Sequence, residues 1–213
     1  MNRLFNFESP LMQILNDVAD LILLNLIWLI CCIPVITIGP SCAAMCCVAR
    51  GMAKGDWPPV LKTFFHAFRS NFKQAIQIFL ALLIPVGLLG YYLLLAASGG
   101  MDDIPMLKYL SWLAIAVIGI VCSYAYPLLA HFDNTVGNTL KNAVILPLAN
   151  PVLALIVTGL NLLPVLLLLI NAELLIRFGF FWVLIGCALT AYINARLLGS
   201  FFQKIAPPED KTE

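Results

Sequence analysis

NLIWLICCIPVITIGPSCAAMCCVAR, residues 25–50, is the part of this 213-residue chain on which its membrane topology depends. All of it except the last residue, Arg50, lies within residues 21–49, a run of 29 that carries no charged side chain. One membrane-spanning helix needs about 20 apolar residues and two need about 40. Pro34 and the pair Gly39-Pro40 fall in the middle of the run, where they favour a helix break or a turn. The run is therefore either one crossing or a hairpin with a short second helix.

The composition is that of a multi-pass membrane protein. Hydrophobic residues make up 62% of the chain and charged residues 11%, whereas soluble domains average about 25% charged residues. The lipid bilayer is therefore the expected surroundings of the chain. A net charge of +1, without a dense cluster of Lys and Arg, excludes nucleic acid as an expected partner.

Four further charge-free runs are each long enough for a membrane-spanning helix. They are residues 74–101, 109–130, 142–172 and 178–195. The sequence therefore predicts an all-α polytopic transmembrane helix bundle of six helices, with five full spans and one short return helix. Residues 1–206 form a single transmembrane domain in this prediction, and residues 207–213 form a short cytoplasmic tail.

In the opening run, we expect a first helix over residues 18–38, a reversal at Gly39-Pro40 and a return helix over residues 41–54. Fourteen residues reach only about 21 Å. The return helix therefore either spans thinly or is shielded by neighbouring helices. The small residues that would permit such close packing are Ser41, Ala43, Ala44 and Ala49.

The charges orient the later spans. Residues 50–73 carry five cations, and the opposite loop, residues 98–108, carries one cation and two aspartates. Cytoplasmic loops are enriched in Lys and Arg, so the basic loop is predicted to be cytoplasmic, with residues 99–105 and 171–177 outside. Arg3 alone does not fix the side of the N-terminus. Six crossings with both termini cytoplasmic is our prediction, and five crossings with the N-terminus outside is the alternative.

An internal repeat is one further hypothesis. Phe7, Phe64 and Phe132 each stand eight residues before a similar small cluster that opens a span. A repeated unit of this kind would give three helix hairpins, each preceded by an interfacial helix. The alternative is that apolar residues match by chance in so apolar a chain.

The basic loop contains a predicted interfacial helix at about residues 58–73. Phe64, Phe68 and Phe72 recur every four residues on one face, with Trp57 just before the helix. A helix of this pattern lies in the membrane interface with its aromatic residues as anchors. The same helix could also dock a partner's cytoplasmic domain.

Few polar residues are candidates for an intramembrane site. Asn161, Asn194 and Arg196 lie in or near apolar helices, where polar groups face a bundle interior or a cavity; Arg196 could instead extend to the interface. Cys42 and Cys46 are one turn apart but lack nearby ligands for a metal. His131 and Asp133 fit a capped helix start better than a proton relay. We predict no catalytic residue, no cofactor and no metal.

The chain resembles the YesL-like family of small bacterial membrane proteins. The resemblance is carried by FESP (residues 7–10), LNLIWLICCIPVITIGPSCAA (24–44), FFHAFRSNFKQA (64–75) and TLKNA (139–143). It implies a multi-pass protein of the bacterial cytoplasmic membrane, often encoded beside carbohydrate ABC transporter and two-component regulatory genes. The family offers no assigned functional residues to carry over.

Two functions are therefore expected from different classes. The first is a non-enzymatic accessory or interaction partner of a carbohydrate-linked transport or sensing system, such as ABC transporter or sensor components. The second is a self-sufficient carrier of a small solute, for which the helix breaks and the buried amides argue. A carrier needs a polar pathway through its own spans, and these spans are almost entirely apolar. The sequence therefore favours the partner function and indicates no enzyme.

Overall fold

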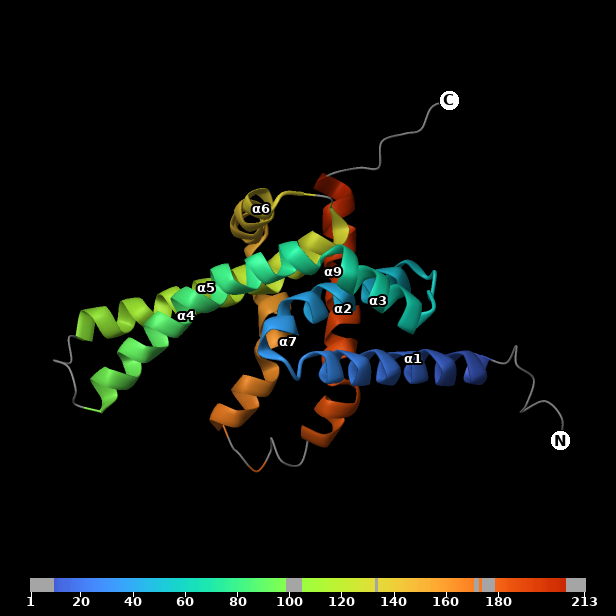
Figure 1. Cartoon of the computed structure of the whole chain (residues 1–213), viewed down its shortest axis with the longest axis horizontal. Helices are drawn as coiled ribbons and strands as arrows, with labels where there is room; N and C mark the ends of the chain where they lie inside the picture. The colour runs from blue at the N-terminus through green and yellow to red at the C-terminus, as the bar shows by residue number, and fades with distance from the viewer. Residues whose placement is uncertain (1–9, 99–104, 133, 171–172, 174–178, 206–213) are drawn as a thin grey trace.

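The computed structural model describes residues 10–98, 105–132, 134–170, 173 and 179–205, and its regular elements there are all helices (Figure 1). The α-helices are α1 (Pro10–Cys31), α2 (Ile38–Lys54), α3 (Val60–Ser70), α4 (Phe72–Ala97), α5 (Pro105–His131), α6 (Val136–Ala149), α7 (Pro151–Ile170) and α9 (Cys187–Ile205). A 3-10 turn, η1 (Val35–Thr37), precedes α2, and a π-helical segment, η2 (Trp182–Gly186), precedes α9.

The predicted all-α polytopic bundle is confirmed. By length and composition, five of the described helices can cross a bilayer, and a sixth crossing is added if one bent helix pair counts as a single span. The five are Met12–Cys31, Val35–Lys54, Phe72–Ala97, Pro105–His131 and Gly179–Phe202. The opening run thus forms two helices joined by a turn, and not one continuous helix.

The reversal in the opening run lies earlier than predicted. The chain leaves α1 at Cys31, turns through Pro34 and enters α2 at Ile38. The hydroxyl of Thr37 fixes the turn: its oxygen lies 2.6 Å from the carbonyl oxygen of Cys31 and 2.7 Å from that of Pro34, and its one proton is shared between them. The predicted turn at Gly39-Pro40 is therefore wrong. Both residues belong to the first turn of α2, where a proline costs no helical hydrogen bond.

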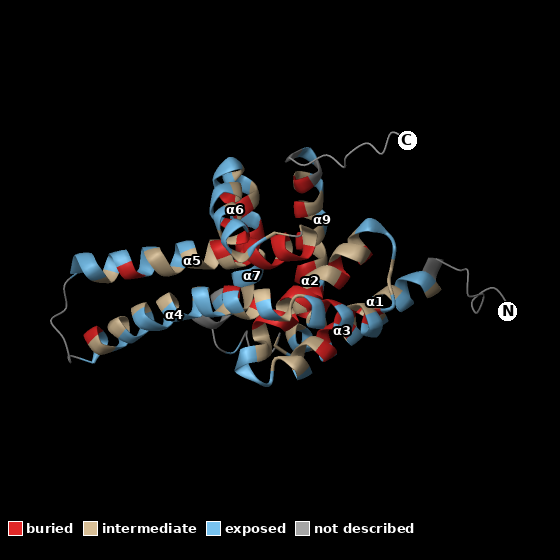
Figure 2. Ribbon diagram, turned by 45° about the horizontal axis from the view of Figure 1, so that its top comes forward, coloured by how far each residue is buried: buried red, intermediate tan, exposed pale blue. Residues whose placement is uncertain are grey.

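The return helix α2 is the centre of the bundle. It packs against α1, α3, α4, α5 and α9, and its 17 residues extend about 25 Å. Figure 2 shows buried residues along it. The four small residues expected to permit close packing, Ser41, Ala43, Ala44 and Ala49, are all fully buried. The return helix is therefore shielded by its neighbours, which was one of the two predicted alternatives.

The fourth predicted span, residues 142–172, is wrong as a single helix. The chain bends by 115° between α6 and α7. Asn150 ends α6, and its side-chain oxygen accepts from the backbone N–H of Leu153 in the first turn of α7. Pro151 then occupies the first position of α7, where proline is favoured. α7 alone has 20 residues and is long enough to span a bilayer.

The helix ends form two groups in Figure 1. One group lies towards the right and the top: the N-terminal end of α1, the whole of α3 and of α6, and the C-terminal end of α9. The break between α1 and α2, and the ends of α4 and α5 next to residues 99–104, lie towards the centre and the left, and the far end of α7 lies at the bottom. Which group faces the cytoplasm stays a prediction from charge. The two predicted outer turns, 99–105 and 171–177, lie almost wholly outside the described residues.

Candidate functional site

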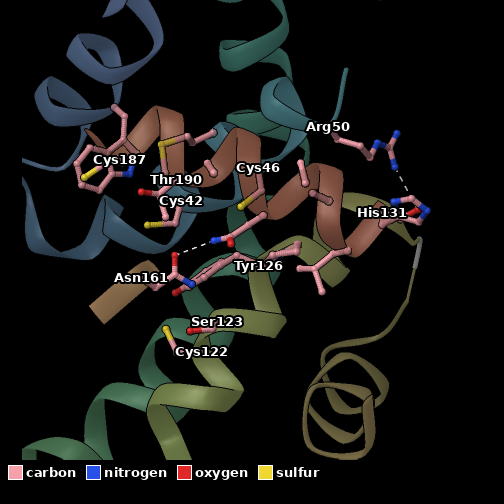
Figure 3. A pocket seen from close by; sticks show the side chains of 18 of the residues that line it. Cys42, Cys46, Arg50, Cys122, Ser123, Tyr126, His131, Asn161, Cys187 and Thr190 are labelled. Atoms are coloured by element: carbon pink, nitrogen blue, oxygen red, sulfur yellow. Dashed lines mark hydrogen bonds between the residues drawn. The ribbon is translucent and has the colours of Figure 1, made fainter. Parts of the chain in front are cut away.

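A cavity of about 390 Å³ lies between α2, α5, α7, η2 and α9. Figure 3 shows the lining side chains converging on it from several helices. The volume is within the range of small-molecule sites in proteins, about 300–1,000 Å³. The cavity is therefore the candidate site around which the polar residues of the chain can be placed.

Two amides selected from the sequence meet in the cavity wall. The Nδ2 of Asn194 on α9 donates to the Oδ1 of Asn161 on α7 at 2.9 Å. Asn194 is only 4% exposed, and its own Oδ1 has no donor within the described part of the chain. A buried acceptor without a donor is destabilising by about 1–3 kcal/mol. This atom is therefore a place where a ligand or an ordered water can bind.

Arg196, the third polar candidate, lies apart from this pair. It is exposed, and its guanidinium carbon lies 5.2 Å above the ring centre of Tyr192. It does not line the cavity. The two asparagines are thus brought together by the fold, whereas Arg196 makes a surface cation–π contact.

Four thiols line the same cavity, from Cys42, Cys46, Cys122 and Cys187. All four are free. No group of three or more His, Cys, Asp or Glu side chains able to hold a metal occurs among the described residues. A buried thiol behaves as a small hydrophobic group. With Trp28, Leu162 and Leu198, the thiols make most of the wall apolar.

Arg50 and His131 lie together at one end of the cavity (Figure 3). Nη1 of Arg50, on α2, donates to the backbone carbonyl of His131 at 3.2 Å. His131 ends α5, and its ring contacts those of Phe132 and Phe202. The helix start after it is capped by Thr135, which accepts from the N–H of Asn138. Asp133 lies outside the described residues.

A buried structural amide that the sequence analysis missed is Asn25. Its side chain is fully buried against the π-helical segment, where it donates to the carbonyl of Val183 at 2.5 Å and accepts from the N–H of Ala188 at 2.9 Å. A π-helical segment displaces backbone groups from the regular helical ladder, and Asn25 pairs with one such group in the segment and one just after it, at the start of α9. A lone amide within the charge-free run was the signal that could have identified it.

The predicted interfacial residues are divided between the protein core and its edge. Phe64 is fully buried in the apolar cluster with Leu24 and Met52. Phe68 stacks on Phe64 and also approaches Phe72, with ring centres 6.2 and 5.5 Å apart. Phe64 therefore packs against the protein and does not face lipid. Its neighbours on the outer face of α3, Leu61 and Phe65, are the exposed apolar side chains.

Trp57 lies in the turn between α2 and α3. It has a positive φ of 37°, and its ring lies 6.2 Å from that of Tyr192 on α9. Gly55, with φ of 88°, ends α2 in the left-handed conformation common at helix C-termini. The tryptophan is thus held against the bundle at the start of α3.

Comparison with known proteins agrees with the resemblance found in the sequence. Residues 21–93, from α1 to α4, match a family described as "Protein of unknown function, DUF624". The chain is 27% identical over 146 residues to "Uncharacterized protein YesL" of Bacillus subtilis (strain 168), an alignment covering 67% of this chain and 68% of that protein. No solved structure matches the chain significantly. The chain is therefore similar to the YesL-like proteins, whose function is not established.

Proposed function

We propose that this protein is a non-enzymatic accessory protein of the bacterial cytoplasmic membrane that binds membrane components of a carbohydrate-linked transport or sensing system. The link to carbohydrate transport comes from the family resemblance. The expectation that the partner is a membrane protein comes from one apolar surface of the molecule.

That surface is the α4–α5 arm, defined as residues 83–98 and 105–117. The arm extends away from the other helices in Figures 1 and 2. It exposes large apolar side chains on both helices: Leu83, Ile84, Leu88, Tyr91 and Leu94 on α4, and Met106, Tyr109, Leu110, Trp112 and Leu113 on α5. Aromatic residues are enriched where proteins bind one another. This arm is the observation that carries the proposal.

The cavity argues against the carrier alternative for a sugar. Each hydroxyl of a sugar needs a hydrogen-bond partner when it leaves water. The wall offers the Asn161–Asn194 pair in its middle and Arg50 with His131 at one end, among mainly apolar side chains. The hydroxyls of Ser123 and Thr190 are already bonded to carbonyls of their own helices. A carrier of a less polar solute remains the second candidate. The chain bends before α7 and has a π-helical segment before α9, and carriers use interrupted helices of this kind at their binding sites.

The test is photo-crosslinking in native membranes, with the crosslinking residue at Leu88 or Tyr109 on the arm. The matched control is Leu155 on α7, which is equally exposed and apolar but lies off the arm. We expect the arm positions, and not Leu155, to capture a membrane subunit of a carbohydrate transporter or sensor. Crosslinking to lipid alone from the arm would contradict the proposal.

A second measurement separates the two candidate functions. The purified chain is placed in liposomes without any other protein, and uptake of labelled sugars and other small solutes is measured. The partner function predicts no uptake above empty liposomes. Uptake by the chain alone would replace the partner proposal with the carrier.

A further inference from the structure

The cavity has one charged end and one apolar end. Arg50 lies at the charged end with His131, while Cys42, Cys187 and Thr190 lie at the other (Figure 3). Among the described residues, Arg50 donates one hydrogen bond, to the His131 carbonyl, and pairs with no carboxylate. A guanidinium has five N–H donors. Within the described part of the chain, most of its hydrogen-bonding capacity and its charge are therefore left for an anion at this end of the cavity.

The wall beyond Arg50 fits a hydrocarbon chain. It consists mainly of thiols, aromatic rings and aliphatic side chains from α2, α5 and α9, and burying methylene groups there stabilises a complex by about 0.8 kcal/mol each. The hydroxyls of Ser123 and Thr190 in this wall donate to their own helices. Asn194, paired with Asn161, keeps an Oδ1 without a donor among the described residues, and this oxygen can accept from an ordered water. Because this oxygen would repel an anionic head group, the head group belongs beside Arg50.

The cavity also reaches the outer surface of the bundle. Leu162 on α7 lines the cavity and is 39% exposed, and the neighbouring Asn161 lines it and is exposed as well. α7 is long and apolar enough to lie in the bilayer. A molecule dissolved in the membrane would therefore reach the cavity beside α7 without passing through water.

From these three features we infer that the cavity is a binding site for a single-chain anionic amphiphile, a fatty carboxylate taken from the bilayer. Its carboxylate pairs with Arg50 and its chain lies along the apolar wall. This goes beyond the proposed partner function, which depends on the α4–α5 arm and not on the cavity. Crosslinking from the arm and ligand binding in the cavity can therefore succeed or fail separately.

The experiment uses dibromostearate, a fatty carboxylate that quenches tryptophan fluorescence, with the full chain in nanodiscs of zwitterionic lipid. Trp28 and Trp182 line the cavity and report binding. The exposed Trp112 and the more distant Trp57 are replaced by phenylalanine to remove signals from outside it. We expect saturable quenching on top of the linear quenching caused by acid dissolved in the lipid.

The charge requirement is tested with Arg50→Gln. This variant should bind the acid more weakly, with an apparent Kd roughly ten- to hundredfold higher, which is the range for a lost hydrogen bond to a charged group. Arg50→Lys should retain most of the affinity. Lys54→Gln is the matched control, because Lys54 lies one turn further along α2, is exposed and does not line the cavity. It should bind like the parent.

A ligand series on the parent protein keeps the test decisive if Arg50→Gln fails to fold. The brominated alcohol and the brominated trimethylammonium of the same chain length should show only the linear quenching. Saturable binding of all three would overturn the anion preference, and linear quenching by all three would overturn the site. Displacement of the acid by benzoate, which stays in water, would assign the cavity to a soluble anion instead of a membrane amphiphile.

Discussion

Gly39 permits α2 and α4 to approach each other closely. A Cβ atom at this position would lie 2.6 Å from the backbone oxygen of Ala75 and 2.8 Å from the Cβ of Phe79. Neither atom belongs to the flexible end of a side chain, so the two helices would have to separate. We expect Gly39→Ala to lower the free energy of unfolding by about 1–3 kcal/mol, as overpacking does, measured by thermal unfolding in detergent.

Gly87, within α4, is the control for this substitution, because a Cβ there meets nothing within 4 Å. Gly87→Ala should leave the unfolding temperature unchanged or raise it slightly, since alanine favours a helix. Equal effects of the two substitutions would show that close packing at Gly39 contributes nothing to stability.

Two adjacent phenylalanines of α3 should differ sharply in their effect on stability. Phe64 is fully buried, whereas Phe65 is 46% exposed. Phe64→Ala should lower the free energy of unfolding by about 3–5 kcal/mol, because it leaves a cavity in the core. Phe65→Ala should cost much less stability and should instead weaken any contact of α3 with lipid. Unfolding in detergent and partition of an isolated α3 peptide into vesicles measure the two effects.

Among the elements, α6 takes a place comparable to that of α3, since each is a short helix that leads into a longer apolar helix. Lys141, Ile145 and Leu148 are exposed along it. These three side chains share one face of the helix. We expect α6 to enter the membrane obliquely, with Lys141 at the surface and Leu148, about 10 Å further along the axis, in the lipid. In a cysteine-free background, Lys141→Cys should react with a charged maleimide, and Leu148→Cys only with a membrane-permeant one. Equal reaction with the charged reagent would place α6 in water.

The elements differ in how well the sequence predicts them, and the reason is physical. Charge-free runs reveal apolar helices because a bilayer demands about 20 such residues, and this criterion found α4 and α5. The same criterion cannot detect a bend without charges, so it missed the one at Asn150, although Asn followed by Pro is a common helix start. Phe64 was misplaced because an apolar face does not reveal whether lipid or protein covers it.

The candidate site was predictable only in part. Asn161 and Asn194 stood out because amides are uncommon in apolar helices. Their mutual hydrogen bond, and the cavity that joins them to Arg50, depend on how α2, α5, α7 and α9 cross in space. Periodicity and spacing describe each helix by itself, so they do not contain this information.

For the whole molecule, the prediction is that both ends of the described chain are cytoplasmic. Gln13 near the start of α1, Asp56 before α3 and Lys204 at the end of α9 are all exposed. A single cysteine at each should be labelled by an impermeant reagent only from the cytoplasmic side of oriented membranes. Labelling of position 13 from the outer face alone would replace six crossings by five.

The bonds of Asn25 also constrain how the molecule is made. Its partners, Val183 and Ala188, follow it by 158 and 163 residues, so they are the last part of the bundle to be synthesised. During translation the first helix enters the membrane with an amide that lacks these partners, and an unpaired polar group is costly in hydrocarbon. The first helix can therefore reach its final position only after the last one has left the ribosome, and a chain truncated before residue 182 should remain with the insertion machinery or be degraded.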